Sequence, residues 1–151
     1  MVAIPALIAF IGILAVLAIF GVRKYIVAAK QVEARNSLQA IGVRATAAYE
    51  RDHKLCASAT APVPEGVPRG MKYQSATADW ARDEGQHAGF SCLQFEMLTP
   101  QYYQYDYEAA ATSFIATARG DLNADGNVSL FQLRGDAVLG STSLEETSPE
   151  E

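Results

Sequence analysis

The sequence has few of the side chains that enzymes most often use: only two histidines and two cysteines occur in 151 residues. His53 and His87 stand in no spacing typical of metal ligands, and no nucleophile motif accompanies them. We therefore interpret both histidines as solvated surface residues, and we predict that the protein is not an enzyme.

Positive charge is also scarce, with 12 Lys and Arg against 17 Asp and Glu and a net charge of −5. Nucleic-acid binding needs cations that displace phosphate counterions, and the scattered Arg69, Lys72 and Arg82 form no such patch. The same deficit argues against adhesion to an anionic membrane surface through a basic patch. We expect no nucleic-acid partner.

Ionisable side chains are absent from residues 1–22, MVAIPALIAFIGILAVLAIFGV. About 20 apolar helical residues cross the ~30 Å hydrocarbon core of a bilayer, so this segment is long enough to span one. A secretory signal peptide would need a basic start and a shorter apolar run. Arg23, Lys24 and Lys30 follow the span, which by the positive-inside rule would leave the rest of the chain in the cytoplasm. Removal of a basic leader from a longer precursor would resolve that topology.

Residues 23–54 contain no proline and are rich in good helix formers. Apolar residues recur every three or four positions, which predicts an amphipathic helix. The expected buried stripe comprises Tyr25, Ala28, Val32, Leu38, Ile41, Ala45, Ala48 and Tyr49. The opposite, solvent-facing side comprises Lys30, Glu33, Arg35, Gln39, Arg44 and Arg51. Gly21 and Gly42 each weaken the helix by about 1 kcal/mol without ending it, so one helix of about 80 Å is expected from near residue 1 to near Asp52.

The second part of the chain has the pattern of a loop followed by strands. Prolines and glycines mark residues 55–70 as a loop, and Trp80 is the expected hydrophobic anchor of the polar segment after it. Alternating apolar residues predict strands over 89–97 and 102–107, and the segments 113–119 and 127–135 flank a turn-rich GDLNADG as a hairpin. The fold class is therefore α+β, with a long helix (1–54), an antiparallel sheet domain (55–140) and a loosely held acidic tail (141–151).

AFIGILAVLAIF (residues 9–20) and its continuation RKYIVAAKQVEARNSLQAI (residues 23–41) resemble the helix of type IV pilins and the related pseudopilins. KYQSATADW, GFSCLQFEM and ARGDLNADGNVSLFQL are similar, less specifically, to the globular domains of pilin-like proteins. The resemblance implies a subunit that waits in the bacterial inner membrane, meets an assembly machinery there, and joins copies of itself in an extracellular filament. A secretion-system pseudopilin, which forms a short internal filament, is a close alternative.

The residues expected to carry assembly lie in the first part of the helix: Met1, Ala3, Pro5, Ala6, Ala9, Gly12, Ala15, Ala18 and Phe20. Small residues at every third position let apolar helices approach closely, although a lipid-facing helix with incidental alanines would look the same. The chain departs from the family at two places. Pro5 or Ala3, depending on the alignment, stands where pilins carry a glutamate, and Phe20 replaces a proline.

The segment DLNADG offers the one candidate metal site. Asp121, Asn123 and Asp125 occupy positions one, three and five of a calcium-loop pattern, but position twelve is Gln132 instead of an acid. The same residues are typical of a plain turn, which we favour because the strongest ligand is missing. No other cofactor is expected.

Cys56 and Cys92 are expected to form a disulfide that ties the helix end to the sheet, in a compartment outside the cytoplasm. Two buried free thiols are the alternative. A different class of function also stays open: a single-pass anchored binding module whose ligand surface would comprise Asp121–Asp125 and the tyrosine strand.

Overall fold

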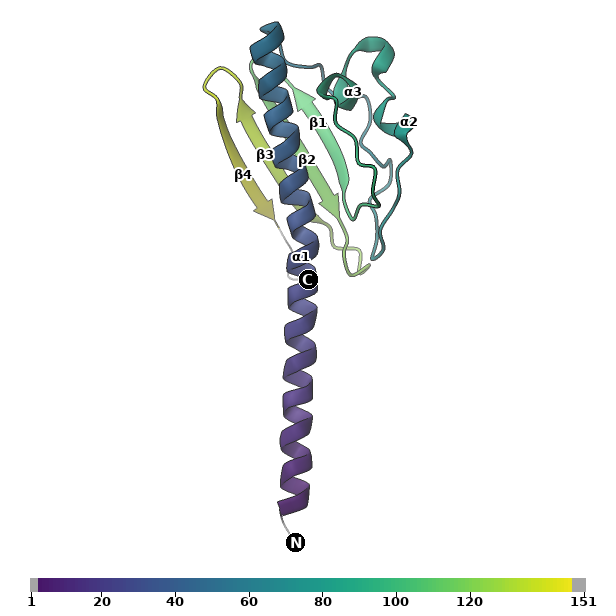
Figure 1. Cartoon of the computed structure of the whole chain (residues 1–151), viewed down its shortest axis with the longest axis vertical. Helices are drawn as coiled ribbons and strands as arrows, with labels where there is room; N and C mark the ends of the chain where they lie inside the picture. Colours follow the sequence, from purple (N-terminus) through teal and green to yellow (C-terminus); the bar gives the residue numbers. More distant parts are fainter. Residues whose placement is uncertain (1–2, 148–151) are drawn as a thin grey trace.

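The protein is a long helical rod with a small sheet domain attached to one half of it (Figure 1). The structure, a computed structural model, describes residues 3–147, with side chains from residue 8 onward. The helices are α1 (Ala3–Asp52), α2 (Thr77–Trp80), the 3₁₀ turn η1 (Glu84–Gln86) and α3 (Gly89–Leu93). The strands are β1 (Gln104–Ala109), β2 (Ser113–Gly120), β3 (Ser129–Asp136) and β4 (Ser141–Thr147). The predicted α+β class is confirmed.

Helix α1 runs without a break through 50 residues, about 75 Å. Its second half packs on the sheet through a stripe of five buried residues with alternating spacings of four and three: Ala34, Leu38, Ile41, Ala45 and Ala48. The predicted stripe is wrong at its start, because Tyr25, Ala28 and Val32 are exposed. At about 100° per residue these three positions face away from the buried stripe, whereas Val27, on the side of the stripe, packs partly buried against the core. In Figure 1 the sheet lies along one side of the second half of α1 and leaves its other side open.

The four strands form an antiparallel meander in the order β1-β2-β3-β4. Small Ala116 and Ala118 of β2 lie between large neighbours: Ala118 pairs with Tyr105 and Phe131, and Ala116 pairs with Tyr107 and Leu133. The alanines leave room for α1, which contacts β2 and β3. The expected hairpin between residues 113–119 and 127–135 is confirmed.

Close approach of the helix to the sheet also explains one of the three glycines within α1. A Cβ on Gly42 would lie 2.5 Å from Cδ2 of the buried Leu133, whereas a Cβ on Gly21 would meet nothing within 4 Å. Glycine at position 42 therefore lowers the helix propensity but allows β3 to pack closely against α1.

Two predicted elements differ in the structure. Residues 89–93 form the short helix α3 instead of a strand, closed by Gln94 in the left-handed region at φ 53°. Gly89, Phe90, Cys92 and Leu93 are buried in this helix and Phe95 in the segment after it, so burial alternates only from Leu93 onward. Residues 141–147 are not a loose tail: they pair with β3 as the edge strand β4. Their side chains are mostly exposed, which is why their composition is polar.

Candidate functional site

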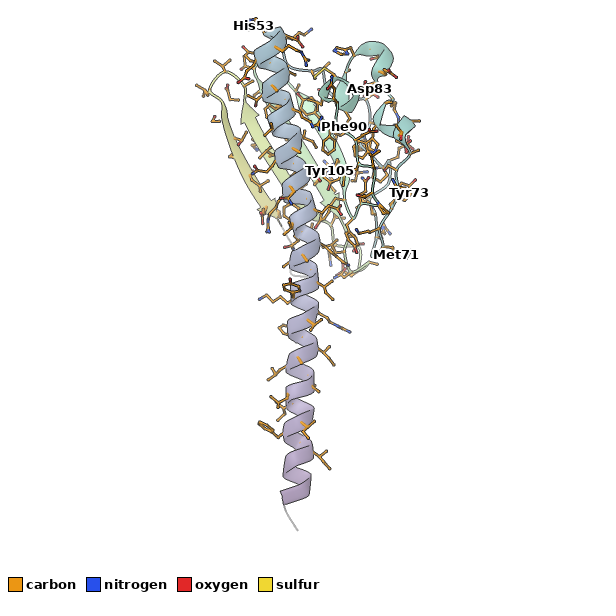
Figure 2. All side chains as sticks on the ribbon, in the orientation of Figure 1. His53, Met71, Tyr73, Asp83, Phe90 and Tyr105 are labelled. Atoms are coloured by element: carbon orange, nitrogen blue, oxygen red, sulfur yellow. A yellow bond between two sulfur atoms is a disulfide. The ribbon has the colours of Figure 1, made fainter. Side chains whose placement is uncertain are left out.

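The first half of α1 carries a large apolar surface that nothing in the chain covers. We call residues 8–22 the apolar segment. Its side chains project from the helix with no other element beside them (Figure 2). Ten large apolar residues are 49–69% exposed: Ile8, Phe10, Ile11, Ile13, Leu14, Val16, Leu17, Ile19, Phe20 and Val22. Full burial of one such side chain is worth about 1.5–3 kcal/mol, so leaving about half or more of each of the ten in water would cost on the order of 10–20 kcal/mol. That is as large as the usual stability of a small domain, so the segment requires an apolar environment.

Those predicted assembly residues whose side chains the structure describes all lie on this surface. Ala9, Gly12, Ala15, Ala18 and Phe20 are all exposed. A period of three drifts by about 60° per step around an α-helix, so the small residues do not form one straight face. They are distributed around much of the circumference. Met1 lies outside the described residues, and of Ala3, Pro5 and Ala6 the structure describes only the helical backbone.

The junction between rod and domain is built around Glu33. Its carboxylate oxygen Oε1 accepts hydrogen bonds from the backbone N–H of Tyr102, at 2.7 Å, and from the hydroxyl of Tyr105, at 3.4 Å. Burial raises the pKa of Glu33, while the hydrogen bond from Tyr102 and the charge of Lys72 oppose that rise. Lys30 and Lys72 both lie over the ring of Tyr102, at 4.7 and 5.0 Å from its centroid.

Two arginines extend the junction on either side of the buried stripe. Arg35 donates from Nε and Nη2 to the two carboxylate oxygens of Glu146 in β4, at 2.6 and 2.7 Å. Arg44 donates to the backbone carbonyls of Leu93 and Gln94. The sequence pattern placed Glu33, Arg35 and Arg44 on the solvent face and missed this role. Glu33 and Arg35 flank the buried Ala34, and that position at the margin of the stripe is the signal that could have indicated it.

The structure pairs Cys56 with Cys92, as the sequence predicts. Their Cα atoms are 5.8 Å apart, and 36 positions separate them in the chain. The bridge joins the segment just after α1 to α3, not to the sheet as expected. Gly89 reinforces it, since its N–H donates to the carbonyl of Ala57 at 2.9 Å.

The predicted calcium-loop residues lie between β2 and β3. Asp121 is buried and accepts through Oδ2 from the N–H of Gly126 at 3.1 Å. Asn123 and Asp125 are exposed, and the backbone N–H of Asn127 holds the pKa of Asp125 below its ordinary value. Gln132 does not contribute to the loop, because its Oε1 accepts from Arg134 at 3.2 Å. The described residues contain no group of three or more His, Cys, Asp or Glu side chains placed to hold a metal ion.

The tyrosine strand and the two histidines, which the sequence offered as further candidates for a functional site, do not form one site. Tyr103, Tyr105 and Tyr107 share one face, as predicted, and all three are fully buried against α1 and the sheet core. They are packing residues, so the tyrosine strand offers no ligand surface on that face. His53 and His87 are exposed near the far end of α1 and after η1, with positive φ angles of 53° and 49°.

One helix in residues 3–147 is long and apolar enough to cross a membrane by length and composition, and it includes the apolar segment. That observation agrees with the predicted transmembrane helix. Neither a protein family, a curated protein nor a solved structure matches this chain.

Proposed function

We propose that the protein is the structural subunit of an extracellular, type IV pilus-like filament, in which the apolar helices of many copies bundle together. The proposal rests on the resemblance of residues 9–41 to the pilin helix and on the surface of α1. One observation carries it: the apolar surface of α1 continues beyond the length that a bilayer can cover.

A membrane-anchored monomer would cover only the first part of that surface. About 20 residues span the hydrocarbon core, and Arg23 and Lys24 mark its boundary with water. Tyr25 and Val32 lie beyond this boundary, yet they are 76% and 45% exposed. The sheet domain contacts α1 from Val27, which packs partly buried against the core, and then at Lys30 and Glu33. Tyr25 and Val32 lie on the side of the helix that faces away from the domain, where neighbouring helices would cover them.

The apolar segment suits transfer between two environments. In the bacterial inner membrane, lipid would keep its ten large side chains from water until an assembly machinery extracts the subunit. In the filament, copies of the same segment would take the place of lipid, so extraction would not expose apolar area to water. Within lipid, helices associate by close packing and not by the hydrophobic effect. Small residues distributed around the helix would allow such packing against several neighbours.

Two alternatives differ in what they leave unexplained. A secretion-system pseudopilin would use the same helix packing and differ in filament length. A single-pass anchored binding module would place Tyr25 at the membrane interface but leave Val32 in water. It would also lose the tyrosine face as a ligand surface, because those rings are buried. The observations therefore favour a subunit that packs against its own copies.

A photo-crosslinking amino acid at Tyr25 tests the proposal in cells that produce the full chain. A filament subunit would give covalent dimers and higher multimers of this chain, together with fibres in sheared surface material imaged by cryo-electron microscopy. Crosslinks to no other copy, with all protein as membrane-bound monomer, would refute the proposal and favour the anchored module. Multimers without surface fibres would overturn the extracellular location and point to a pseudopilin.

A matched pair of variants separates assembly from folding. Val16→Lys places a charge in the apolar segment, whereas Val138→Lys places it at a similarly exposed valine in the turn between β3 and β4; the two side chains are 67% and 61% exposed. We expect Val16→Lys to abolish the multimers and Val138→Lys to retain them. Equal crosslinking of both variants would contradict a role for the apolar segment.

A further inference from the structure

Four basic residues that no carboxylate neutralises gather where the domain approaches the apolar segment. Among the described residues, none of the four forms a salt bridge: Arg23, Lys24, Lys30 and Lys72. Five other basic residues each lie within 4.0 Å of a carboxylate: Arg35, Arg51, Arg82, Arg119 and Arg134. We call the first four the basic collar, which therefore carries four positive charges that no ion pair offsets.

The collar combines two segments that are far apart in the sequence. Lys72, in the loop before α2, reaches the level of Lys30 on α1, because both ammonium groups lie over the ring of Tyr102, at 5.0 and 4.7 Å from its centroid. Lys24 precedes Lys30 by less than two turns of the helix, about 9 Å. Glu33 is the acidic residue of α1 at this level, and its Oε1 accepts from the N–H of Tyr102. The overall deficit of positive charge in the chain therefore hides a local excess.

Arg23 and Lys24 mark the end of the apolar segment, and hence one surface of a bilayer that this segment spans. An anionic surface attracts basic side chains within one Debye length, about 8–10 Å near physiological ionic strength. Lys30 and Lys72 lie at about that distance from the surface, and their long side chains can extend toward it. We propose that the basic collar binds the head groups of anionic phospholipids and so holds the domain against the bilayer before assembly. This inference rests on the membrane-bound state that the proposed function includes.

Two observations identify a lipid surface as the partner. The collar is continuous with the apolar segment, so a bilayer around that segment brings its head groups to Arg23 and Lys24. Met71, between Arg69 and Lys72, is 77% exposed, and Figure 2 shows it at the end of the domain from which the apolar segment leaves. Exposed apolar side chains beside basic ones are typical of segments that lie on anionic membranes. The rest of the chain is acidic, so the collar would determine which end of the domain faces the lipid.

Lipid crosslinking from position 71 tests the inference. The full chain, with a photo-crosslinking amino acid in place of Met71, is reconstituted in nanodiscs of phosphatidylcholine alone or mixed equally with phosphatidylglycerol, and lipid adducts are quantified by mass spectrometry. We expect phosphatidylglycerol to raise the yield about threefold or more, and high salt, which shortens the Debye length to about 3 Å, to remove that gain. Equal yields in both lipids would overturn the proposal, as would adducts only to another copy of the chain.

Two lysine variants assign the effect to the collar. Lys72→Gln removes one charge at the level of Lys30, whereas Lys54→Gln removes the same charge just after the far end of α1, and both side chains are exposed. We expect Lys72→Gln to lower the adduct yield in phosphatidylglycerol discs about two- to fivefold and Lys54→Gln to leave it unchanged. Fluorescence of Trp80 during urea unfolding checks that both variants fold. Equal yields from the two folded variants would refute the assignment.

The inference and the proposed function fail separately. Multimers crosslinked at Tyr25 in cells, without lipid adducts in nanodiscs, would overturn the lipid-binding collar and leave the filament proposal standing. Lipid adducts without such multimers would support the collar and overturn the filament.

Discussion

Replacement of Glu33 tests whether the junction between rod and domain depends on one hydrogen-bond acceptor. Glu33→Ala removes the oxygen that accepts from the N–H of Tyr102 and from the hydroxyl of Tyr105. Glu33→Gln keeps an oxygen at that position and removes the charge. The two variants therefore separate the acceptor from the ionisation of the carboxyl group.

The expected loss follows from the hydrogen bonds. An unsatisfied buried donor costs about 1–3 kcal/mol, and the partly open surroundings of Glu33 place the expected loss at about 1–2 kcal/mol. Alanine returns a few tenths of a kcal/mol through helix propensity. Glu33→Gln should stay within about 0.5 kcal/mol of the wild type, because it preserves the acceptor and removes the cost of burying a charge.

Urea unfolding of the full chain in detergent micelles, followed by Trp80 fluorescence, measures the effect. Trp80 is the single tryptophan and packs edge-on against Phe90 and Phe95 in the domain core. With a slope of about 1–3 kcal/mol per M urea, we expect the midpoint of Glu33→Ala to fall by about 0.5–1.5 M. Gln39→Ala, at an exposed position of the same helix, is the control. Equal midpoints for the Ala and Gln variants of Glu33 would refute the reasoning.

The wild type and Glu33→Gln should differ in how their free energy of unfolding depends on pH, and the sign of that difference follows from the pKa of Glu33. Burial raises the folded-state pKa of Glu33 above its ordinary value of 4.5. The folded state then holds the proton more tightly, so this contribution to stability is present at low pH and is lost as pH rises through the raised pKa. The free energy of unfolding of the wild type, relative to Glu33→Gln, should fall as pH rises above 4.5. A difference independent of pH would contradict the burial of the charged carboxylate.

Three further predictions concern the domain. A double-mutant cycle on Arg35 and Glu146 should give a coupling of about 0.2–1 kcal/mol that shrinks in high salt, since the pair is partly exposed; a coupling insensitive to salt would contradict this. Gly135→Ala should cost about 1–3 kcal/mol in urea unfolding, because its Cβ would lie 2.2 Å from the buried ring of Phe114, whereas Gly66→Ala, with open space around it, should be neutral. Reduction of the disulfide should lower stability by about 3–4 kcal/mol for a loop of this length, and an unchanged Tm under reducing conditions would refute that role.

The elements that the sequence predicts well are those whose signals are local. Helix α1 ends at Asp52 as expected, because a proline-free run of helix formers is followed by the proline-rich loop. The β2–β3 hairpin is likewise set by the turn residues between two alternating segments, and Tyr103, Tyr105 and Tyr107 alternate onto the buried face. No distant partner is needed to recognise any of these patterns.

The elements that the sequence misassigns depend on distant partners. Strand β4 is polar and mostly exposed, and it becomes a strand because the open edge of β3 offers it hydrogen bonds and Arg35 offers Glu146 a partner. Residues 89–93 form a short helix that ends at the left-handed residue Gln94 and is tied to Cys56 by the disulfide, although the apolar residues of 93–97 alternate as in a strand. Likewise, the role of Glu33 follows only from where the segment around Tyr102 passes the helix.

The side of α1 that the domain covers is the feature that the periodicity did not set. Tyr25, Ala28 and Val32 recur at helical spacing, but at about 100° per residue they face away from the buried stripe that begins at Ala34, and Val27 packs against the domain in their place. Tyr25 and Val32 are therefore exposed apolar residues beyond the basic pair Arg23 and Lys24. In the filament that we propose, a neighbouring helix would cover them with the same surface that covers the apolar segment.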